Sequence, residues 1–158
     1  MHYILDVDGT LTSGIDSDKV LPEMLENCRN AVAQGHKLVL ASNQGGVMLG
    51  YRTLEATLAR IAKIAGEVGA IDYYICTWHF VGYAYKKTGH NPDGHYSDDP
   101  SWRKPEPGML QHIIQKYGLT PQTCVYIGDR AQYKDAAIAA GIPFEWHLNW
   151  RVKSADPS

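Results

Sequence analysis

Short apolar runs alternate with helical segments along almost the whole of this chain, and this alternation is what most limits its fold. The expected strands are Tyr3–Val7, Lys37–Ala41, Ile71–Cys76, Cys124–Gly128 and Pro143–His147. Helical spacing of apolar residues indicates helices from Pro22 to a stop at Gly35, from a Thr53 cap to about Ala65, from Pro107 to Tyr117, and from Ala131 to Ala140. Such alternation builds a parallel sheet with helices on both faces. We therefore expect an α/β fold in which a central parallel sheet is covered by helices on both faces.

The stretch from Thr77 to Trp102 interrupts this pattern. It is rich in aromatic residues, His, Gly and Asp and has no clear periodicity, so it is expected to be a long loop of about 25 residues. Loops of that length in compact domains are usually functional or mobile. At 158 residues the chain is expected to be a single domain, residues 1–158, with this loop on the substrate side.

Two carboxylates stand one residue apart where the first strand should open into a loop. Side chains alternate in an extended segment, so Asp6 and Asp8 leave on the same side and can address one reacting group. Gly9 lets the chain turn away from that group. The alternative is an ordinary acidic turn that closes a strand, because Asp and Gly are common turn residues. Matching polar groups downstream favour a phosphoryl-transfer motif.

Four polar clusters lie at the ends of expected strands or the starts of expected helices: Asp6/Asp8, Ser42–Asn43, Arg103–Lys104–Pro105 and Gly128–Asp129–Arg130. Groups just beyond the carboxyl ends of parallel strands converge on one crevice. Carboxylates facing a phosphate dianion would repel by about 4 kcal/mol per close pair at an effective dielectric near 20. A divalent cation is therefore expected, and oxygen ligands of this kind suit Mg²⁺.

Each of these groups has a distinct expected role. Asp6 is the candidate nucleophile, and Asp8 can protonate the leaving oxygen and later deprotonate water. Lys104 would neutralise charge on the phosphoryl oxygens, the Ser42 hydroxyl would orient them, and Asp129 would hold the metal. Taken singly, Lys104 could be a solvated surface lysine, and Ser42 with its neighbour could be an ordinary strand-ending turn.

With these motifs in place, the chain resembles the haloacid dehalogenase superfamily of aspartate-nucleophile phosphotransferases. The resemblance rests on the runs Asp6–Leu11, Ala41–Gln44, Lys104 and Gly128–Asp129, and more narrowly on Arg103–Met109 and Asn43–Val47. These last two runs resemble the subgroup of histidinol-phosphate phosphatases, heptose-bisphosphate phosphatases and polynucleotide 3′-phosphatases.

The resemblance implies the haloacid dehalogenase fold, which is a Rossmann-like three-layer sandwich with a central parallel sheet, and hydrolysis of a phosphomonoester. It also implies Mg²⁺ held by Asp6, the backbone carbonyl of Asp8, and Asp129. The substrate-binding candidates in the matching motifs are Thr10, Ser42, Asn43 and Arg103. Only about 30 residues separate the first two motifs, so the fold is expected to be essentially capless and its site open.

The chain departs from its relatives at two places. Members of the subgroup commonly carry zinc ligands where this chain reads Cys76–His79 and Pro100–Trp102, so no structural zinc is expected. Three histidines in the loop could form another metal site, but their irregular spacing favours histidines that are solvated or packed. They are His79, His90 and His95. Many relatives also have a second Asp in the fourth motif. A gap-free match places Tyr133 there, and Asp135 could substitute if the helix began differently.

The sequence leaves the substrate open between a phosphorylated sugar or small metabolite and a nucleic-acid 3′-phosphate end. Aromatic and basic residues in the long loop could stack on bases and hold phosphates, although rings that merely pack the loop onto the sheet are the slightly favoured reading. These residues are Trp78, Phe80, Tyr83, Tyr85, Lys86, Lys87, Tyr96 and Trp102. The alternative function is a non-catalytic module that binds phosphate or a partner and retains the fold.

Charge, cysteine content and the lack of long apolar runs limit the binding partners and the cell compartment to be expected. A net charge of −2 and a pI near 6.4 argue against bulk electrostatic binding of nucleic acid, although a local basic groove is compatible with them. Three widely spaced cysteines fit reduced thiols better than a disulfide framework. No signal sequence or run of 18 apolar residues is present, so a cytoplasmic protein without membrane contact is expected.

Overall fold

The computed structural model describes residues 1–80 and 87–155. Within them, seven strands form one sheet in the order β4-β5-β3-β2-β1-β6-β7, in which every neighbouring pair is parallel except β4 and β5. The strands are β1 (His2–Leu5), β2 (Lys37–Asn43), β3 (Asp72–Cys76), β4 (His90–Asn91), β5 (Tyr96–Ser97), β6 (Cys124–Gly128) and β7 (Phe144–Trp146). The helices are α1 (Pro22–Ala33), α2 (Leu54–Val68), α3 (Gly108–Tyr117) and α4 (Ala131–Ala140).

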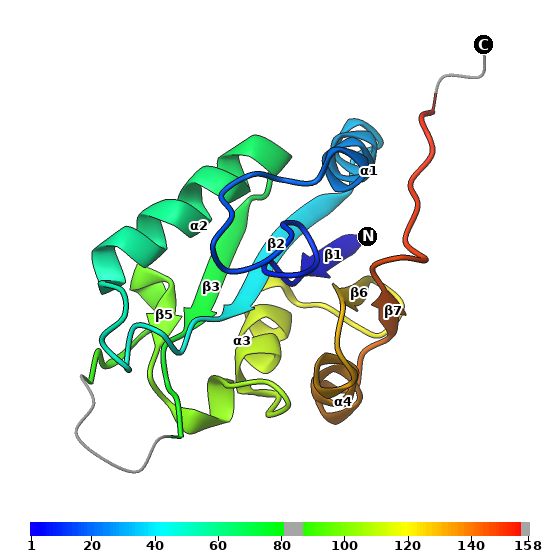
Figure 1. Cartoon of the computed structure of the whole chain (residues 1–158). Helices are drawn as coiled ribbons and strands as arrows, with labels where there is room; N and C mark the ends of the chain where they lie inside the picture. Colours follow the sequence, from blue (N-terminus) through cyan, green and yellow to red (C-terminus); the bar gives the residue numbers. More distant parts are fainter. Residues whose placement is uncertain (81–86, 156–158) are drawn as a thin grey trace.

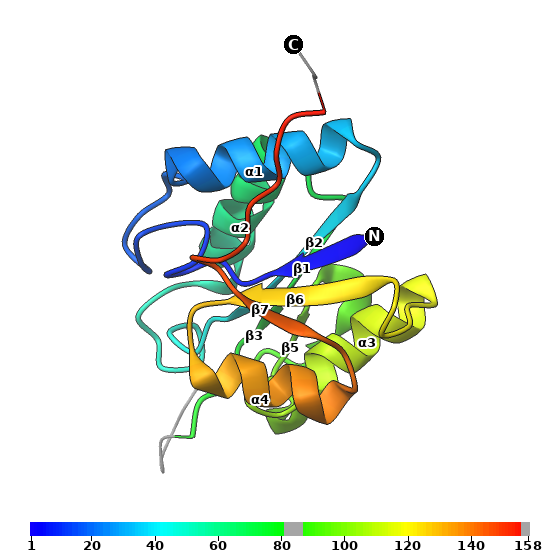
Figure 2. The same cartoon turned by 90° about the vertical axis from the view of Figure 1, so that its right-hand side faces the viewer.

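The elements form three layers. Helices α1 and α2 cover one face of the sheet, and α3 and α4 cover the other (Figures 1 and 2). Strand β1 lies inside the sheet between β2 and β6, so Ile4 packs into the core on the α3–α4 side and Leu5 into the core on the α1–α2 side. The expected α/β three-layer sandwich with a mostly parallel sheet is therefore confirmed.

Local signals explain the two helices on the first face. Pro22 occupies the first position of α1, where its missing N–H costs nothing. The Thr53 side chain accepts a hydrogen bond from the Ala56 N–H and caps α2, which ends at the left-handed Gly69. One apolar residue of α1 lies outside the core, because Val32 is 40% exposed although it stands four positions after buried Cys28.

The strand bounds differ from expectation at the edge that matters for the site. Strand β2 continues two residues beyond the expected end at Ala41, because Ser42 and Asn43 remain paired with Ile75 and Cys76 of β3. The polar pair is thus held on a strand, and the reading of it as a strand-ending turn is wrong. Strand β1 ends at Leu5, two residues earlier than expected.

The expectation of an irregular loop from Thr77 to Trp102 is wrong in its second half. Strands β4 and β5 extend the sheet there, and two 3₁₀ turns, Pro92–Gly94 and Pro100–Trp102, follow them closely. Two-residue strands are too short to produce a readable alternation, so nothing in the sequence pattern marks them. Of the aromatic and basic residues named for this loop, Tyr83, Tyr85 and Lys86 lie outside the described residues.

All three cysteines lie in the described part of the chain, where each is buried and free. Among the described residues, no helix is both long and apolar enough to cross a membrane.

Candidate active site

Asp6 lies at the centre of the carboxyl edge of the sheet. It directly follows β1, and its backbone N–H donates to the Ile127 carbonyl of β6 at 3.0 Å. Its carboxylate is buried, and Oδ1 accepts a hydrogen bond from Lys104 Nζ at 2.8 Å. The Thr10 hydroxyl lies 3.4 Å from the other oxygen. The first turn after β1 therefore places a buried carboxylate beside a buried ammonium group.

Lys104 is held in place on every side. Its Nζ donates to Asp6, to the Ala41 carbonyl at 2.9 Å and to the Tyr126 hydroxyl. The ring of Tyr133 lies 3.9 Å from Nζ, so the cation faces an aromatic surface. The reading of Lys104 as a solvated surface lysine is wrong, because the residue is 1% exposed.

Burial moves the pKa values of this pair toward each other. Loss of solvent raises the pKa of Asp6 to about 6, although the nearby Lys104 ammonium opposes the change. Loss of solvent also lowers the pKa of Lys104, and the Asp6 carboxylate opposes that change. An ionised Asp6 in this site therefore depends on the cation beside it.

The backbone of Lys104 is fixed by Asn43. The Asn43 side chain accepts from the Lys104 N–H and donates to the Lys104 carbonyl, each at 3.2 Å. Both polar functions of the Asn43 amide are thus used to join β2 to the segment that carries Lys104. This geometry places Asn43 in support of the lysine.

Asp129 presents an unpaired oxygen at the same edge. Its Oδ1 is buried without a hydrogen-bond partner among the described residues. A Cβ atom on Gly9, whose φ is +83°, would lie 2.2 Å from Asp129 Oδ2, so only glycine allows this close approach. An unsatisfied buried carboxylate oxygen is costly unless a cation or donor is added.

The donor set fits Mg²⁺. The described residues contain no group of three or more His, Cys, Asp or Glu side chains placed to hold a metal. A site here would therefore use the carboxylates of Asp6 and Asp129 together with a backbone oxygen, for which the Asp8 carbonyl is the candidate. Hard oxygen donors and a few waters are the usual surroundings of protein-bound Mg²⁺.

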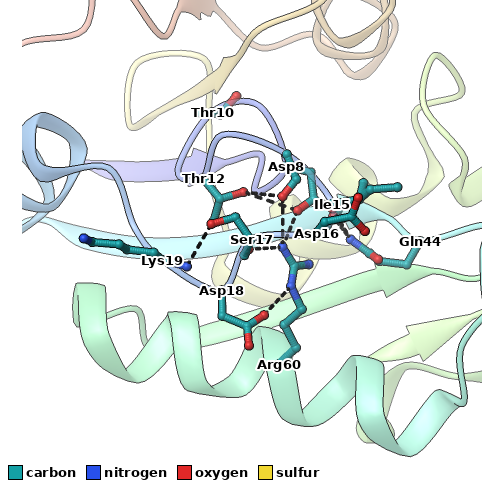
Figure 3. A network of polar contacts seen from close by, with 12 residues as sticks. Asp8, Thr10, Thr12, Ile15, Asp16, Ser17, Asp18, Lys19, Gln44 and Arg60 are labelled. Carbon is teal, nitrogen blue, oxygen red and sulfur yellow. Dashed lines mark hydrogen bonds and ion pairs between the residues drawn. The ribbon is translucent and has the colours of Figure 1, made fainter.

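Asp8 is held by two side chains from other elements. Arg60 Nη2 of α2 donates to Asp8 Oδ1 at 2.6 Å, and Gln44 Nε2 donates to Oδ2 at 2.7 Å (Figure 3). Gln44 Nε2 also lies 2.8 Å from the Ser42 hydroxyl, which is buried. The Asp8 side chain is only 13% exposed. Ser42 therefore reaches Asp8 through Gln44.

Arg103 lies at the wall of a cavity of about 590 Å³ beside Lys104. Its Nη1 donates to the Trp78 carbonyl at 3.2 Å, and its guanidinium lies 5.6 Å from the centre of the Phe80 ring. Trp78 and Phe80 also line the cavity. Trp102 is buried and Tyr96 packs against the core, so those two rings join the loop to the sheet.

The two departures from the family pattern have clear places in the structure. Tyr133 is buried against Lys104, whereas Asp135 is exposed on α4. Of these two residues, Tyr133 is therefore the one that lies beside the lysine. The three histidines each pack differently: His79 stacks on Phe80, His90 shares a hydrogen bond with Ser97 Oγ, and His95 stacks on Tyr73. The absence of a structural zinc stays a prediction.

The motif-based reading missed Arg60 and Gln44. Gln44 lies in the Ala41–Gln44 run, but no role was expected for it. Arg60 lies three residues after buried Thr57 and four before buried Ile64, on the inner face of α2. A cation on a buried helix face signals a partner, and that spacing could have identified Arg60.

Comparisons with known proteins agree with this geometry. A family model described as polynucleotide kinase 3 phosphatase matches residues 5–150. A D-glycero-beta-D-manno-heptose-1,7-bisphosphate 7-phosphatase from Pseudomonas putida is 33% identical, over 87% of this chain and 77% of that protein. The enzyme of the same name from Haemophilus influenzae is 29% identical, over 97% of this chain and 82% of that protein.

Solved structures show the same fold. A D,D-heptose 1,7-bisphosphate phosphatase from B. bronchiseptica, complexed with magnesium and phosphate, has a TM-score of 0.71 at 24% identity, covering 90% of this chain and 78% of that one. A putative HAD-like phosphatase from Mesorhizobium loti has a TM-score of 0.68 at 26% identity, covering 89% and 68%. The chain therefore belongs to the polynucleotide kinase 3 phosphatase family, and so to the phosphatases of the haloacid dehalogenase superfamily.

Proposed function

We propose that this protein hydrolyses phosphomonoesters with Mg²⁺ through an aspartyl-phosphate intermediate on Asp6. One observation carries the proposal: Lys104 Nζ lies 2.8 Å from Asp6 Oδ1 in a buried site. Near it, Asp129 presents a buried oxygen without a partner among the described residues. A nucleophile, a fixed cation and a free metal ligand are the parts that phosphoryl transfer needs.

The first step forms one bond and breaks one. A carboxylate oxygen of Asp6 attacks phosphorus, the bond from phosphorus to the leaving oxygen breaks, and Asp8 gives that oxygen a proton. In the second step water attacks the phosphorus, Asp8 takes a proton from the water, and the Asp6–phosphorus bond breaks to release inorganic phosphate. Lys104 keeps a positive charge beside the transferring group in both steps.

The residues that would hold Mg²⁺ are Asp6, Asp129 and the Asp8 carbonyl. When bound, the ion would offset the negative charge of the phosphoryl oxygens. Gly9 serves this arrangement because its missing side chain leaves room for the Asp129 carboxylate.

The first substrate class to test is a phosphorylated sugar or small metabolite. The curated relatives that support it are named as heptose-bisphosphate phosphatases. A nucleic-acid 3′-phosphate end is the second class, and the cavity beside Lys104 favours it, because Trp78 and Phe80 offer aromatic faces and Arg103 a cation. The family model that matches residues 5–150 also supports this class, because it is described as polynucleotide kinase 3 phosphatase.

The experiment is a substrate panel on the purified protein. Heptose 1,7-bisphosphate, other sugar phosphates, nucleotides and a 3′-phosphorylated oligonucleotide are assayed for phosphate release with Mg²⁺ and with EDTA. We expect release that requires Mg²⁺ and is strongest for one substrate class. No release from any member, or release unaffected by EDTA, would overturn the proposal.

Asp6→Asn tests the nucleophile directly. It should lower kcat by more than about 10³-fold, since removing a nucleophile typically costs at least that much. Circular dichroism should show an unchanged fold. Asp135→Asn is the matched control, because it removes an exposed carboxylate from α4, and it should leave kcat unchanged. Full activity of Asp6→Asn would exclude Asp6 as the nucleophile.

A further inference from the structure

Arg60 contacts both Asp8, the candidate general acid, and the segment 14–18 that follows it. It lies on α2, and its side chain is only 11% exposed. Figure 3 shows it reaching from the helix toward Asp8 and the segment 14–18. No motif of the superfamily resemblance includes this residue.

Two of the three guanidinium nitrogens of Arg60 donate hydrogen bonds, and Nη1 is buried without a partner among the described residues. Its Nη2 donates to Asp8 Oδ1 at 2.6 Å, to the Ser17 carbonyl at 2.7 Å and to the Gly14 carbonyl at 3.4 Å. Its Nε donates to Asp18 Oδ1 at 3.0 Å. A planar guanidinium can satisfy several acceptors in fixed directions, which a lysine ammonium on a flexible stem does less well.

Asp8 is thereby fixed from two directions. Arg60 holds Oδ1 and Gln44 holds Oδ2, and the Thr12 hydroxyl lies 3.4 Å from Oδ1. An unrestrained aspartate samples several χ1 rotamers, whereas a carboxylate held at both oxygens keeps one. A group that delivers a proton must lie within hydrogen-bond reach of the leaving oxygen, so this restraint bears on the rate of that step.

We infer that Arg60 is a positioning residue that keeps the Asp8 carboxylate in the orientation needed for proton transfer to the leaving group. The inference rests on the proposed function, because it assumes that Asp8 is the general acid. Arg60 does not line the cavity beside Lys104. Its loss should therefore lower kcat and leave KM nearly unchanged.

The competing explanation is structural. Arg60 also binds the segment 14–18, so its removal could loosen the loop after β1 and impair the site in a general way. The two explanations differ in which substrates suffer. A misplaced acid slows only reactions whose leaving group needs a proton, whereas a loosened site slows all of them.

The experiment compares two leaving groups and four proteins. Wild type, Arg60→Met, Asp8→Asn and the double variant are assayed with an alkyl phosphate, a poor leaving group, and with 2,4-dinitrophenyl phosphate, a good one. Asp8→Asn should cost about 10²-fold in kcat on the alkyl phosphate. Arg60→Met should cost roughly 10-fold or more there, and less than about 3-fold on the dinitrophenyl ester.

The double variant is the sharpest measurement. If Arg60 acts through Asp8, removing both should cost no more than Asp8→Asn alone on the alkyl phosphate. A further loss in the double variant that multiplies the two single losses would overturn the inference, as would an equal loss on both substrates. Lys63→Met is the matched control, because it removes an exposed cation from the same helix, and it should leave both rates unchanged.

Failure of the inference can be told from failure of the proposed function. If wild type releases no phosphate from either ester, the proposed function falls. If wild type is active and Asp8→Asn loses nothing on the alkyl phosphate, Asp8 is not the acid, and the inference about Arg60 falls alone. If Asp8→Asn loses activity selectively but Arg60→Met does not, only the role of Arg60 falls. Should Arg60→Met fail to fold, Arg60→Lys replaces it, and the same selective loss at a smaller size is required.

Discussion

At the scale of single residues, two tyrosines form much of the surroundings of the Lys104 ammonium. The ring of Tyr133 lies 3.9 Å from it. The Tyr126 hydroxyl accepts a hydrogen bond from the same nitrogen. A desolvated cation over an aromatic face gains about 2 kcal/mol, so the tyrosines offset part of the cost of burying this ammonium.

Gly9 gives a prediction at this scale. Gly9→Ala should lower Mg²⁺ affinity roughly 10- to 100-fold, the range seen when groups that orient metal ligands are disturbed, because the new Cβ would lie 2.2 Å from Asp129 Oδ2. Isothermal titration with Mg²⁺ measures the change. Gly141→Ala is the control, since its φ of +76° carries the same backbone strain but nothing lies within 4 Å. Equal affinity in the two variants would contradict this account of Asp129.

At the scale of elements, α1 holds the end of the chain. After β7 the chain runs beside α1 (Figure 2), where side chains spaced along the helix meet backbone groups of the extended segment. Asn27 Nδ2 donates to the Trp150 carbonyl and Asn27 Oδ1 accepts from the Val152 N–H, both at 3.0 Å. Asn30 donates to the Val152 carbonyl at 2.8 Å. Trp150 is thereby kept buried against the core.

Asn27→Ala should therefore destabilise the protein. Asn27 is 4% exposed, and its loss leaves the buried Trp150 carbonyl and the partly buried Val152 N–H unpaired, which costs about 1–3 kcal/mol. Urea unfolding followed by tryptophan fluorescence gives the free energy of unfolding. Glu26→Ala, an exposed neighbour on the same helix, should change that free energy by less than about 0.5 kcal/mol. Similar losses in both variants would deny Asn27 this role.

At the scale of the whole molecule, polar groups gather at both ends of the sheet. One group forms the candidate active site, and the other joins β3 to α3. The carboxyl ends of the central strands carry Asp6, Asp129 and their partners. At the start of β3, Asp72 accepts hydrogen bonds from Lys116 and Tyr117 of α3, at 2.8 Å and 2.7 Å, and from Tyr74 at 2.7 Å. Burial raises the pKa of Asp72, but these hydrogen bonds outweigh it and lower the pKa to about 2.

This pKa predicts an acid limit to stability. Asp72 has a folded pKa below its ordinary value of 3.8, so its contribution is complete above about pH 4 and is lost as the pH falls toward about 2. The difference in unfolding free energy between wild type and Asp72→Asn should shrink across that window. Urea unfolding between pH 2 and 6 measures it. Asp135→Asn should show a small difference throughout, and a constant difference for Asp72→Asn would refute the prediction.

The sequence by itself determined the layered α/β fold and the positions of the motifs. Periodicity is a local property, and parallel strands necessarily bring their carboxyl ends together, so Asp6, Lys104 and Asp129 could be expected to meet from the order of elements alone. The same local reading found the cap at Thr53 and the end of α4 at Gly141.

Tertiary structure decided what surrounds those motifs. Arg60 reaches Asp8 from 52 positions away, and β5 is a strand because β3 offers it an edge, as β5 in turn does for β4. Such contacts form when the layers of the fold pack together, and a local sequence pattern does not show which distant residues will meet. The burial that raises the pKa of Asp6 to about 6 has the same origin, since it arises from the atoms of several elements at once.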